Sequence, residues 1–283
     1  MVKYKSIKTL NKLKNFICEG GRRTKRSQKN YKNYKPFFSI ITVVKNSSKK
    51  IEKTLQSVIN QPFKNIEHIV VDGNSEDNTF VKIKKFEKKI EYWCSIKDKG
   101  IYDAMNYGIK LSKGNVIVIL NAGDIFTLNA FEIIRKYFQK NKKLSFLFGT
   151  VKRHYLNNNL VIKSGFDRKR INYNFDSQTC HSSGFFIKSD IQKKIGLYNL
   201  KYKCSSDYDL FYKLFKNKNF KGDSTKKNEF IGIVESGGFS SKFGFWNHLI
   251  EETKIRNDNN QNKVLILIIF FNAIFKHYLK KIF

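Results

Sequence analysis

Prolines and acidic residues are scarce in this sequence. Its 283 residues include two prolines, and 23 acidic residues stand against 55 lysines and arginines, for a formal net charge of +32. The whole composition is biased towards lysine, so the charge alone assigns no partner. The hydrophobic fraction of 41% is ample for a buried core and argues against disorder.

Paired cysteines and glycine-rich phosphate loops are absent as well. Cys18, Cys94, Cys180 and Cys204 are scattered without a Cys-x-x-Cys pair, which fits neither a disulfide scaffold nor a zinc knuckle and favours a reducing compartment. No expected strand is followed by Gly-x-Gly-x-x-Gly, and Gly-x-x-x-x-Gly-Lys-Ser/Thr does not occur. A dinucleotide oxidoreductase or a P-loop enzyme is therefore not expected.

The N-terminal segment, residues 1–35, is strongly basic. It carries twelve lysines and arginines against one acid, Glu19, and apolar residues recur among them at spacings of three or four. This spacing predicts a basic amphipathic helix up to Gly20. The lysines are not followed by an apolar run of signal-peptide length, so we expect no signal peptide.

The C-terminal segment, residues 246–283, is expected to be helical. Its apolar run at 264–275 (VLILIIFFNAIF) has twelve residues, whereas a membrane-spanning helix needs about 20. Two interpretations stay open, a core helix and a helix lying in the membrane interface. Lys263 and Lys276 begin a basic rim that would suit the second.

Between these ends, expected strands alternate with expected helices. Short apolar runs, rich in β-branched residues, occur at 38–44, 66–71 and 116–120, and a further strand is expected around 92–94. The alternation predicts an α/β fold with a mostly parallel central sheet and helices on both faces. Residues 143–240 are less regular and more polar, which indicates a second half built onto the first.

Polar residues follow all four expected strands. In an open α/β sheet, ligands bind at the carboxyl ends of the strands. A single aspartate there would often cap the next helix, but three of them together indicate a site. Carboxylates can bind a ribose or a base, or hold Mg²⁺ or Mn²⁺ against a diphosphate. In chain order these strand-end residues are Thr42, Asp72, Asp98, Lys99, Asn121 and Asp124.

Several of these segments together resemble glycosyltransferase family 2, the inverting GT-A enzymes. The resemblance is closest to the branch that builds capsule, exopolysaccharide and lipopolysaccharide chains. It covers about two hundred residues in the family's order, and DKGIYDAMN is its most specific piece. The matching segments are 39–46 (SIITVVKN), 54–61 (TLQSVINQ), 68–79 (HIVVDGNSEDNT), 98–109 (DKGIYDAMNYGI), 119–124 (ILNAGD), 181–199, 205–214 (SSDYDLFYKL) and 236–240 (SGGFS).

The resemblance implies a Rossmann-like GT-A domain at 36–245, with a donor half at 36–142, an acceptor half at 143–240 and a C-terminal helical extension. It implies that Asp207 is the general base, and that Asp124 binds a divalent cation, Mn²⁺ or Mg²⁺. The donor nucleotide-sugar would be bound by Thr42, Asp72, Asp98, Lys99 and Asn121.

Two positions depart from the family's pattern. The Asp-x-Asp metal motif has Asn121 and Gly123 in place of its two acids, which leaves Asp124 one place later and puts the metal requirement in doubt. Asp209 lies about 200° around a helix from Asp207 and is expected to be a first-turn carboxylate that faces elsewhere. His181 would lie near the diphosphate or acceptor, or be a structural histidine.

The expected function is transfer of a sugar from a nucleoside diphosphate, with UDP as first choice, to a hydroxyl of a growing glycan or lipid-linked oligosaccharide. The expected location is the cytoplasm, peripheral on the inner face of the cell membrane. Two alternatives are a catalytically impaired GT-A scaffold and a basic nucleic-acid-binding protein, although no reading motif for nucleic acid is present. A sugar-phosphate nucleotidyltransferase would need a glycine-rich loop where residues 45–49 read KNSSK.

Overall fold

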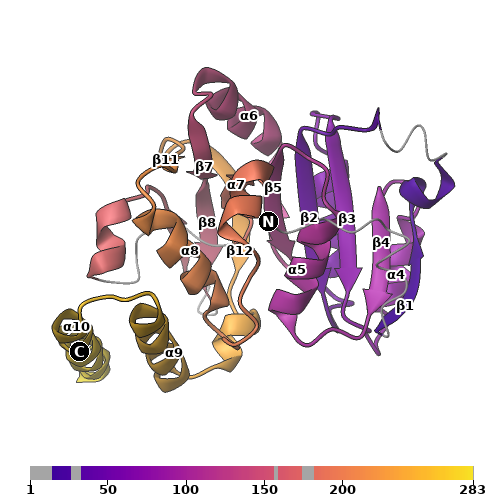
Figure 1. The fold of residues 1–283 in the computed structure, drawn as a ribbon. Coiled ribbons are helices and arrows are strands. Elements are labelled where there is room, and N and C mark those ends of the chain that lie inside the picture. Colours follow the sequence, from indigo (N-terminus) through magenta and orange to yellow (C-terminus); the bar gives the residue numbers. More distant parts are fainter. Residues whose placement is uncertain (1–14, 27–32, 156–158, 174–181, 283) are drawn as a thin grey trace.

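The computed structural model describes residues 15–26, 33–155, 159–173 and 182–282 (Figure 1). At its centre is an eight-stranded mixed sheet. Its strands, from one edge to the other, are β1 (Phe16–Gly20), β4 (Tyr92–Ile96), β3 (Ile66–Asp72), β2 (Phe38–Val44), β5 (Val116–Asn121), β10 (Phe185–Lys188), β7 (Leu144–Phe148) and β11 (Lys221–Ser224).

The four central strands of this sheet are parallel. β2 pairs with β3 on one side and with β5 on the other, and β3 pairs with β4. The carboxyl ends of all four therefore meet at one edge of the sheet. Every residue of β2 is buried, as expected for a strand covered on both faces. The predicted α/β fold is confirmed.

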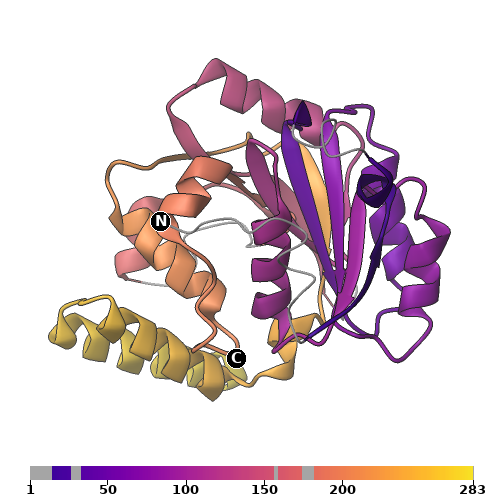
Figure 2. The ribbon, with the colours of Figure 1, turned by 45° about the vertical axis from the view of Figure 1, so that its right-hand side comes forward.

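Helices cover both faces of the sheet (Figure 2). Because side chains alternate along a strand, Ile41 and Val43 of β2 pack on one side while Ile40 and Val44 pack on the other. The first side holds α5 (Ile101–Leu111), α7 (Ser189–Ile195) and α8 (Ser206–Lys216). The second holds α3 (Ile51–Ile59), α4 (Thr79–Lys85) and α6 (Ala130–Lys140).

Residues 143–240 contribute to two sheets, which accounts for their irregular pattern. β7, β10 and β11 extend the main sheet, whereas a second sheet has the order β6-β12-β8-β9. These strands are short, and β9 is largely exposed, so hydrophobic periodicity is weak. The remaining elements are β6 (Ile125–Phe126), β8 (Thr150–His154), β9 (Leu160–Lys163), β12 (Phe230–Glu235) and the 3₁₀ helices η1 (Arg22–Lys25), η2 (Arg168–Asn172) and η3 (Phe239–Lys242).

The helix expected up to Gly20 is wrong for its last residues. Phe16–Gly20 form β1, which pairs antiparallel with β4, while residues 1–14 lie outside the described part of the chain. This pairing satisfies backbone groups at an otherwise open edge, which outweighs the helical spacing of the apolar residues. At Gly20 the backbone lies against the Trp93 ring, where a Cβ would collide with it.

A buried ion pair fastens the basic segment to the sheet. Arg23 of η1 donates to the carboxylate of Glu67 in β3, and their side chains are 1% and 0% exposed. Arg23 also donates to the carbonyl of Leu111 at 3.1 Å. The same carboxylate accepts the Ser39 hydroxyl and the N–H of Gly114, so Glu67 links three segments.

The C-terminal helices form an antiparallel pair beside α8, seen at the lower edge of both ribbon views. They are α9 (Phe245–Asp258) and α10 (Lys263–Ile282), and the ring of Phe245 stacks on His277 at 3.9 Å. The predicted helical extension is confirmed. Among the described residues, no helix is long and apolar enough to cross a membrane.

One face of α10 is apolar and uncovered. Ile266 and Ile269 are buried against the rest of the protein, so α10 is not a core helix buried all round. Its uncovered apolar side chains are each more than half exposed, and they are Val264, Leu267, Ile268, Phe271 and Phe275.

The Arg23–Glu67 pair yields a stability prediction. Replacing Arg23 with Met leaves a buried carboxylate without its cation, and we expect the free energy of unfolding to fall by about 3–5 kcal/mol. Denaturant unfolding measures this change. Arg22→Met is the matched control, because Arg22 is 48% exposed and its pair with Glu91 contributes at most about 1 kcal/mol. Equal losses in both variants would contradict the proposed role of the pair.

Candidate active site

The parallel register brings the predicted strand-end residues to one edge. Val44, the last residue of β2, pairs with Asp72 of β3, and Val43 pairs with Asn121 of β5. Asp72 in turn pairs with Ser95 of β4, two residues before the loop that carries Asp98. These side chains thus follow neighbouring strands in the order Asp98, Asp72, Asn121.

Asp72 and Asp98 form a pair of neighbouring carboxylates. Asp72 is buried and accepts the Ser95 hydroxyl at 2.7 Å and the N–H of Ser75. The Asp98 carboxylate packs against Gly73, where a Cβ would collide with it. Burial raises the pKa of Asp98, and the charge of Asp72 adds to the increase. A cation or a hydrogen-bond donor of a ligand would therefore be stabilised between these groups.

Lysine side chains lie beside Asp98 and beside Gly123. The charge of Lys45, which follows β2, lowers the pKa of Asp98 against the effect of burial. The Lys50 ammonium lies 3.9 Å from the position that a Cβ would take at residue 123. Gly123 has φ +111°, a conformation that disfavours any side chain there. Lys99 is exposed, and its backbone N–H donates to Asp103.

The side chain of Thr42 faces the interior. It is fully buried, and its hydroxyl lies 2.8 Å from Nε2 of His68. The predicted donor contact of Thr42 therefore stays a prediction, because the side chain has no exposed surface in this structure. Burial lowers the pKa of His68 to about 3, so the imidazole is neutral.

Asn121 and Asp124 differ in how their side chains are satisfied. The Asn121 Oδ1 is buried and has no hydrogen-bond partner among the described residues. An unpaired buried acceptor costs about 1–3 kcal/mol, which indicates a donor supplied by a ligand or by water. Asp124 accepts the Ser182 hydroxyl at 2.7 Å with one oxygen and the N–H of Glu235 at 3.2 Å with the other.

Asp207 lies in the first turn of α8, next to α5. The Tyr102 hydroxyl lies 2.9 Å from its Oδ1 and 3.0 Å from the carbonyl of Cys204. Burial, together with the charge of Asp207, raises the pKa of Tyr102 well above 10, so the phenol stays a donor. Tyr102 follows Asp98 by four residues, and the start of α5 thereby joins Asp207 to the strand-end carboxylates.

Sequence comparison matches this arrangement to one family. The model of Glycosyl transferase family 2 matches residues 39–196, which include the strand-end residues and exclude Asp207. The chain belongs to glycosyltransferase family 2.

Curated relatives of this family member are named as glycosyltransferases. The chain is 25% identical over 228 residues to the UDP-Glc:alpha-D-GlcNAc-diphosphoundecaprenol beta-1,3-glucosyltransferase WfgD of Escherichia coli, which covers 80% of this chain and 84% of WfgD. It is 27% identical over 186 residues to a PGL/p-HBAD biosynthesis glycosyltransferase of Mycobacterium tuberculosis, covering 64% of this chain and 71% of that protein.

Solved structures share the GT-A fold. S. aureus TarS 1-349 in complex with UDP-GlcNAc aligns with a TM-score of 0.65 at 15% identity, over 84% of this chain and 72% of that one. The mannosyltransferase PcManGT from Pyrobaculum calidifontis, in complex with GDP-Man and Mn²⁺, aligns with a TM-score of 0.59 at 14% identity, over 94% and 73%. At these identities the likeness establishes the fold alone.

The described residues of this glycosyltransferase contain no cluster of three or more His, Cys, Asp or Glu side chains that could by itself hold a metal ion. Both carboxylate oxygens of Asp124 also accept hydrogen bonds from Ser182 and Glu235. The cation that the sequence predicts at Asp124 stays a prediction, and the reaction proposed for this protein is derived without it.

Two further sequence expectations concern Asp209 and His181. Asp209 is a first-turn carboxylate of α8, as expected, and faces away from Asp207 towards Lys213 at 2.6 Å and Asn259 at 3.0 Å. His181 lies outside the described residues.

Sequence reasoning missed Glu251 of α9. Its carboxylate accepts the backbone N–H groups of Lys203, Cys204 and Ser205, at 2.7, 2.9 and 2.9 Å. Nothing in the sequence around Glu251 distinguishes it from any other helical glutamate, because its partners are 46 to 48 residues away.

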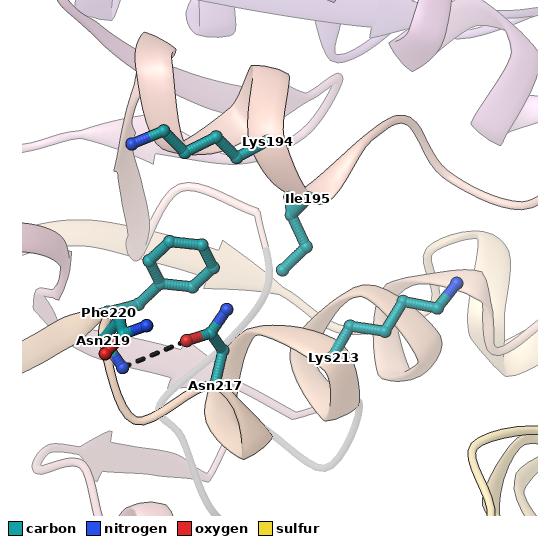
Figure 3. Close-up of a pocket in the computed structure, with 6 residues that line it drawn as sticks. All are labelled: Lys194, Ile195, Lys213, Asn217, Asn219 and Phe220. Atoms are coloured by element: carbon teal, nitrogen blue, oxygen red, sulfur yellow. Dashed lines mark hydrogen bonds between the residues drawn. The ribbon is translucent and has the colours of Figure 1, made fainter. Parts of the chain in front are cut away.

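A hollow of about 480 Å³ lies at the other end of α8 (Figure 3). It is roughly 15 Å from Asp207 along the helix axis, at 1.5 Å per residue. It contains none of the strand-end residues and no carboxylate, so it is not the candidate active site. Its lining residues are Lys194, Ile195, Lys213, Asn217, Asn219 and Phe220.

The buried imidazole of His68 predicts acid sensitivity. Between pH 6.5 and about 3 the unfolded chain binds a proton at this residue and the folded protein does not, so acid favours unfolding. We expect this group to lower the free energy of unfolding by up to about 1.4 kcal/mol per pH unit in that window. Denaturant unfolding of the wild type and of His68→Gln at pH 7.0, 6.0 and 5.0 measures it. His154→Gln serves as control, since the side chain of His154 is 44% exposed. Equal slopes for wild type and His68→Gln would contradict the prediction.

Proposed function

We propose that this family member is an inverting transferase, which moves a sugar from a nucleoside-diphosphate sugar to a hydroxyl of a growing glycan or lipid-linked oligosaccharide. The observation that carries the proposal is the hydrogen bond from Tyr102 to Asp207, since it links this carboxylate to the helix that begins three residues after Asp98. Nucleoside recognition and a base for the acceptor are then available on one side of the domain.

The donor proposal assigns the nucleoside to the carboxylates and the diphosphate to the lysines. Carboxylates suit the ribose hydroxyls and a base N–H, for which we propose Asp72 and Asp98. The unpaired Oδ1 of Asn121 can accept one further hydrogen bond. Lys45 and Lys50 lie beside this rim and suit a diphosphate, and Lys99 is exposed nearby. A UDP-sugar is the first choice, because the names of WfgD and of the TarS complex specify UDP-sugars.

In the proposed reaction Asp207 acts as the general base. It takes the proton of the acceptor hydroxyl while that oxygen attacks the anomeric carbon, and the bond from this carbon to the nucleoside diphosphate breaks. Attack from the face opposite the leaving group inverts the configuration. A positioned base of this kind contributes roughly 10²–10⁴-fold in rate. The Mn²⁺ or Mg²⁺ expected from the sequence stays a prediction for Asp124.

The acceptor proposal includes the membrane. WfgD is named for a diphosphoundecaprenol-linked acceptor, which supports a lipid-linked acceptor here. The uncovered apolar face of α10, with Lys263 and Lys276 exposed, suits a helix that lies in the interface of an anionic membrane. We therefore propose peripheral attachment at the inner face of the cell membrane. The division into a donor half at 36–142 and an acceptor half at 143–240, expected from the sequence, is part of the same proposal.

Replacing Asp207 with Asn tests the proposed base. The amide keeps the shape but cannot take the proton, so we expect transfer to fall by about 10²–10⁴-fold while the dissociation constant of the donor is unchanged. Transfer is measured as the amount of nucleoside diphosphate released. Donor binding is measured by calorimetry.

Asp209→Asn is the matched control, since Asp209 is on the same helix turn and faces Lys213 and Asn259. It should keep its activity. Wild-type turnover in Asp207→Asn, or loss of donor binding, would overturn the base assignment. A wild-type protein that binds donors but transfers to no glycan or lipid-linked acceptor would favour the scaffold alternative.

A further inference from the structure

The start of α8 is capped by another helix. The N-cap residue Ser205 makes no side-chain hydrogen bond to its own helix. The N–H groups of Lys203, Cys204 and Ser205 instead point to the Glu251 carboxylate of α9. Burial raises the pKa of Glu251, but the hydrogen bonds lower it by more, so the pKa of this carboxylate is below its ordinary value. An ionised carboxylate at a helix N-terminus also interacts favourably with the helix dipole.

The segment before Asp207 is held from two sides. Cys204 donates its N–H to Glu251 at 2.9 Å, while its carbonyl lies 3.0 Å from the Tyr102 hydroxyl. His248, one turn before Glu251 on α9, lies 3.2 Å from the Ser205 hydroxyl through Nδ1. Because Tyr102 also contacts Asp207, the position of this carboxylate depends on both α5 and α9.

The helix that carries Glu251 and His248 is also the partner of α10. Phe245 at the start of α9 stacks on His277 of α10. Further along, Arg256 of α9 is buried and donates to the carbonyl of Ile171 at 3.0 Å. α9 is therefore packed against the acceptor half, and α10 packs on α9.

We propose that Glu251 is a positioning residue for Asp207, so that the C-terminal helices are a working part of the active site. Glu251 touches neither Asp207 nor a substrate in this account, and it acts by fixing the backbone of residues 203–205. The inference rests on the proposed role of Asp207 as base. Small displacements of a catalytic group can cost about 10²-fold in rate, whereas a cap that serves stability alone would leave turnover by the folded protein unchanged.

A matched carboxylate on the same helix separates these roles. Asp258 of α9 also binds the preceding loop, through Lys201 at 2.6 Å and the Tyr202 hydroxyl at 2.5 Å. Its hydrogen bonds go to residues 201 and 202, so it stabilises the loop without holding the start of α8. Asp258→Asn therefore reports what the loss of a loop contact from α9 does to folding and rate.

The experiment compares full-length wild type, Glu251→Gln, Glu251→Ala and Asp258→Asn. The proposal predicts that Glu251→Ala lowers kcat by about 10-fold to 100-fold, that Glu251→Gln lowers it less, and that the donor KM is unchanged in both. Melting temperatures of all variants are measured alongside, and rates are compared well below them. Asp258→Asn should retain the wild-type kcat, even where its melting temperature falls as far as that of Glu251→Gln.

Equal kcat in Glu251→Gln, Glu251→Ala and Asp258→Asn would overturn the positioning role, and so would a loss that appears only in KM. If Glu251→Ala does not fold, Glu251→Gln alone decides between the two outcomes. The proposed function fails separately, if wild type and Asp207→Asn show the same turnover.

Discussion

The contact between the Tyr102 hydroxyl and the first turn of α8 is the constraint on which the site depends. Tyr102 lies in the first turn of α5 in the proposed donor half, whereas Cys204 and Asp207 lie in the proposed acceptor half. The burial that keeps this phenol protonated also keeps it a donor, so the carboxylate of Asp207 is fixed relative to the strand ends. Without this contact the proposed base would lose its hydrogen bond to the helix that follows Asp98.

Sequence reasoning predicted the parallel strands well because their signals are local. Four apolar runs and the polar residues that follow them define the parallel strands, and the register then brings Asp72 and Asn121 to the two sides of β2. Asp209 was expected to face away from Asp207, and the structure has both in the first turn of α8 with Asp209 facing Lys213 and Asn259. These features depend on spacings of a few residues along the chain.

The missed features depend on partners far away in sequence. Phe16 pairs with Ile96 of β4. This segment is therefore a strand and not a helix because it pairs with the edge of the sheet, which the local sequence pattern does not reveal. Glu251 meets Cys204 across 47 residues. Tertiary packing, and not local preference, decides each of these.

The account rests on the strand-end carboxylates as the site of a nucleoside-diphosphate sugar. The most direct test is the melting temperature of wild type and Asp98→Asn with UDP-, GDP-, CDP- and dTDP-sugars, each with and without Mn²⁺. A ligand that binds only the folded state stabilises it by RT ln(1 + [L]/Kd). We expect sugars of one nucleotide, with UDP as first choice, to raise the melting temperature of wild type. The same ligands should raise the melting temperature of Asp98→Asn much less. An equal rise in both proteins, or no rise with any donor in well-folded wild type, would contradict it.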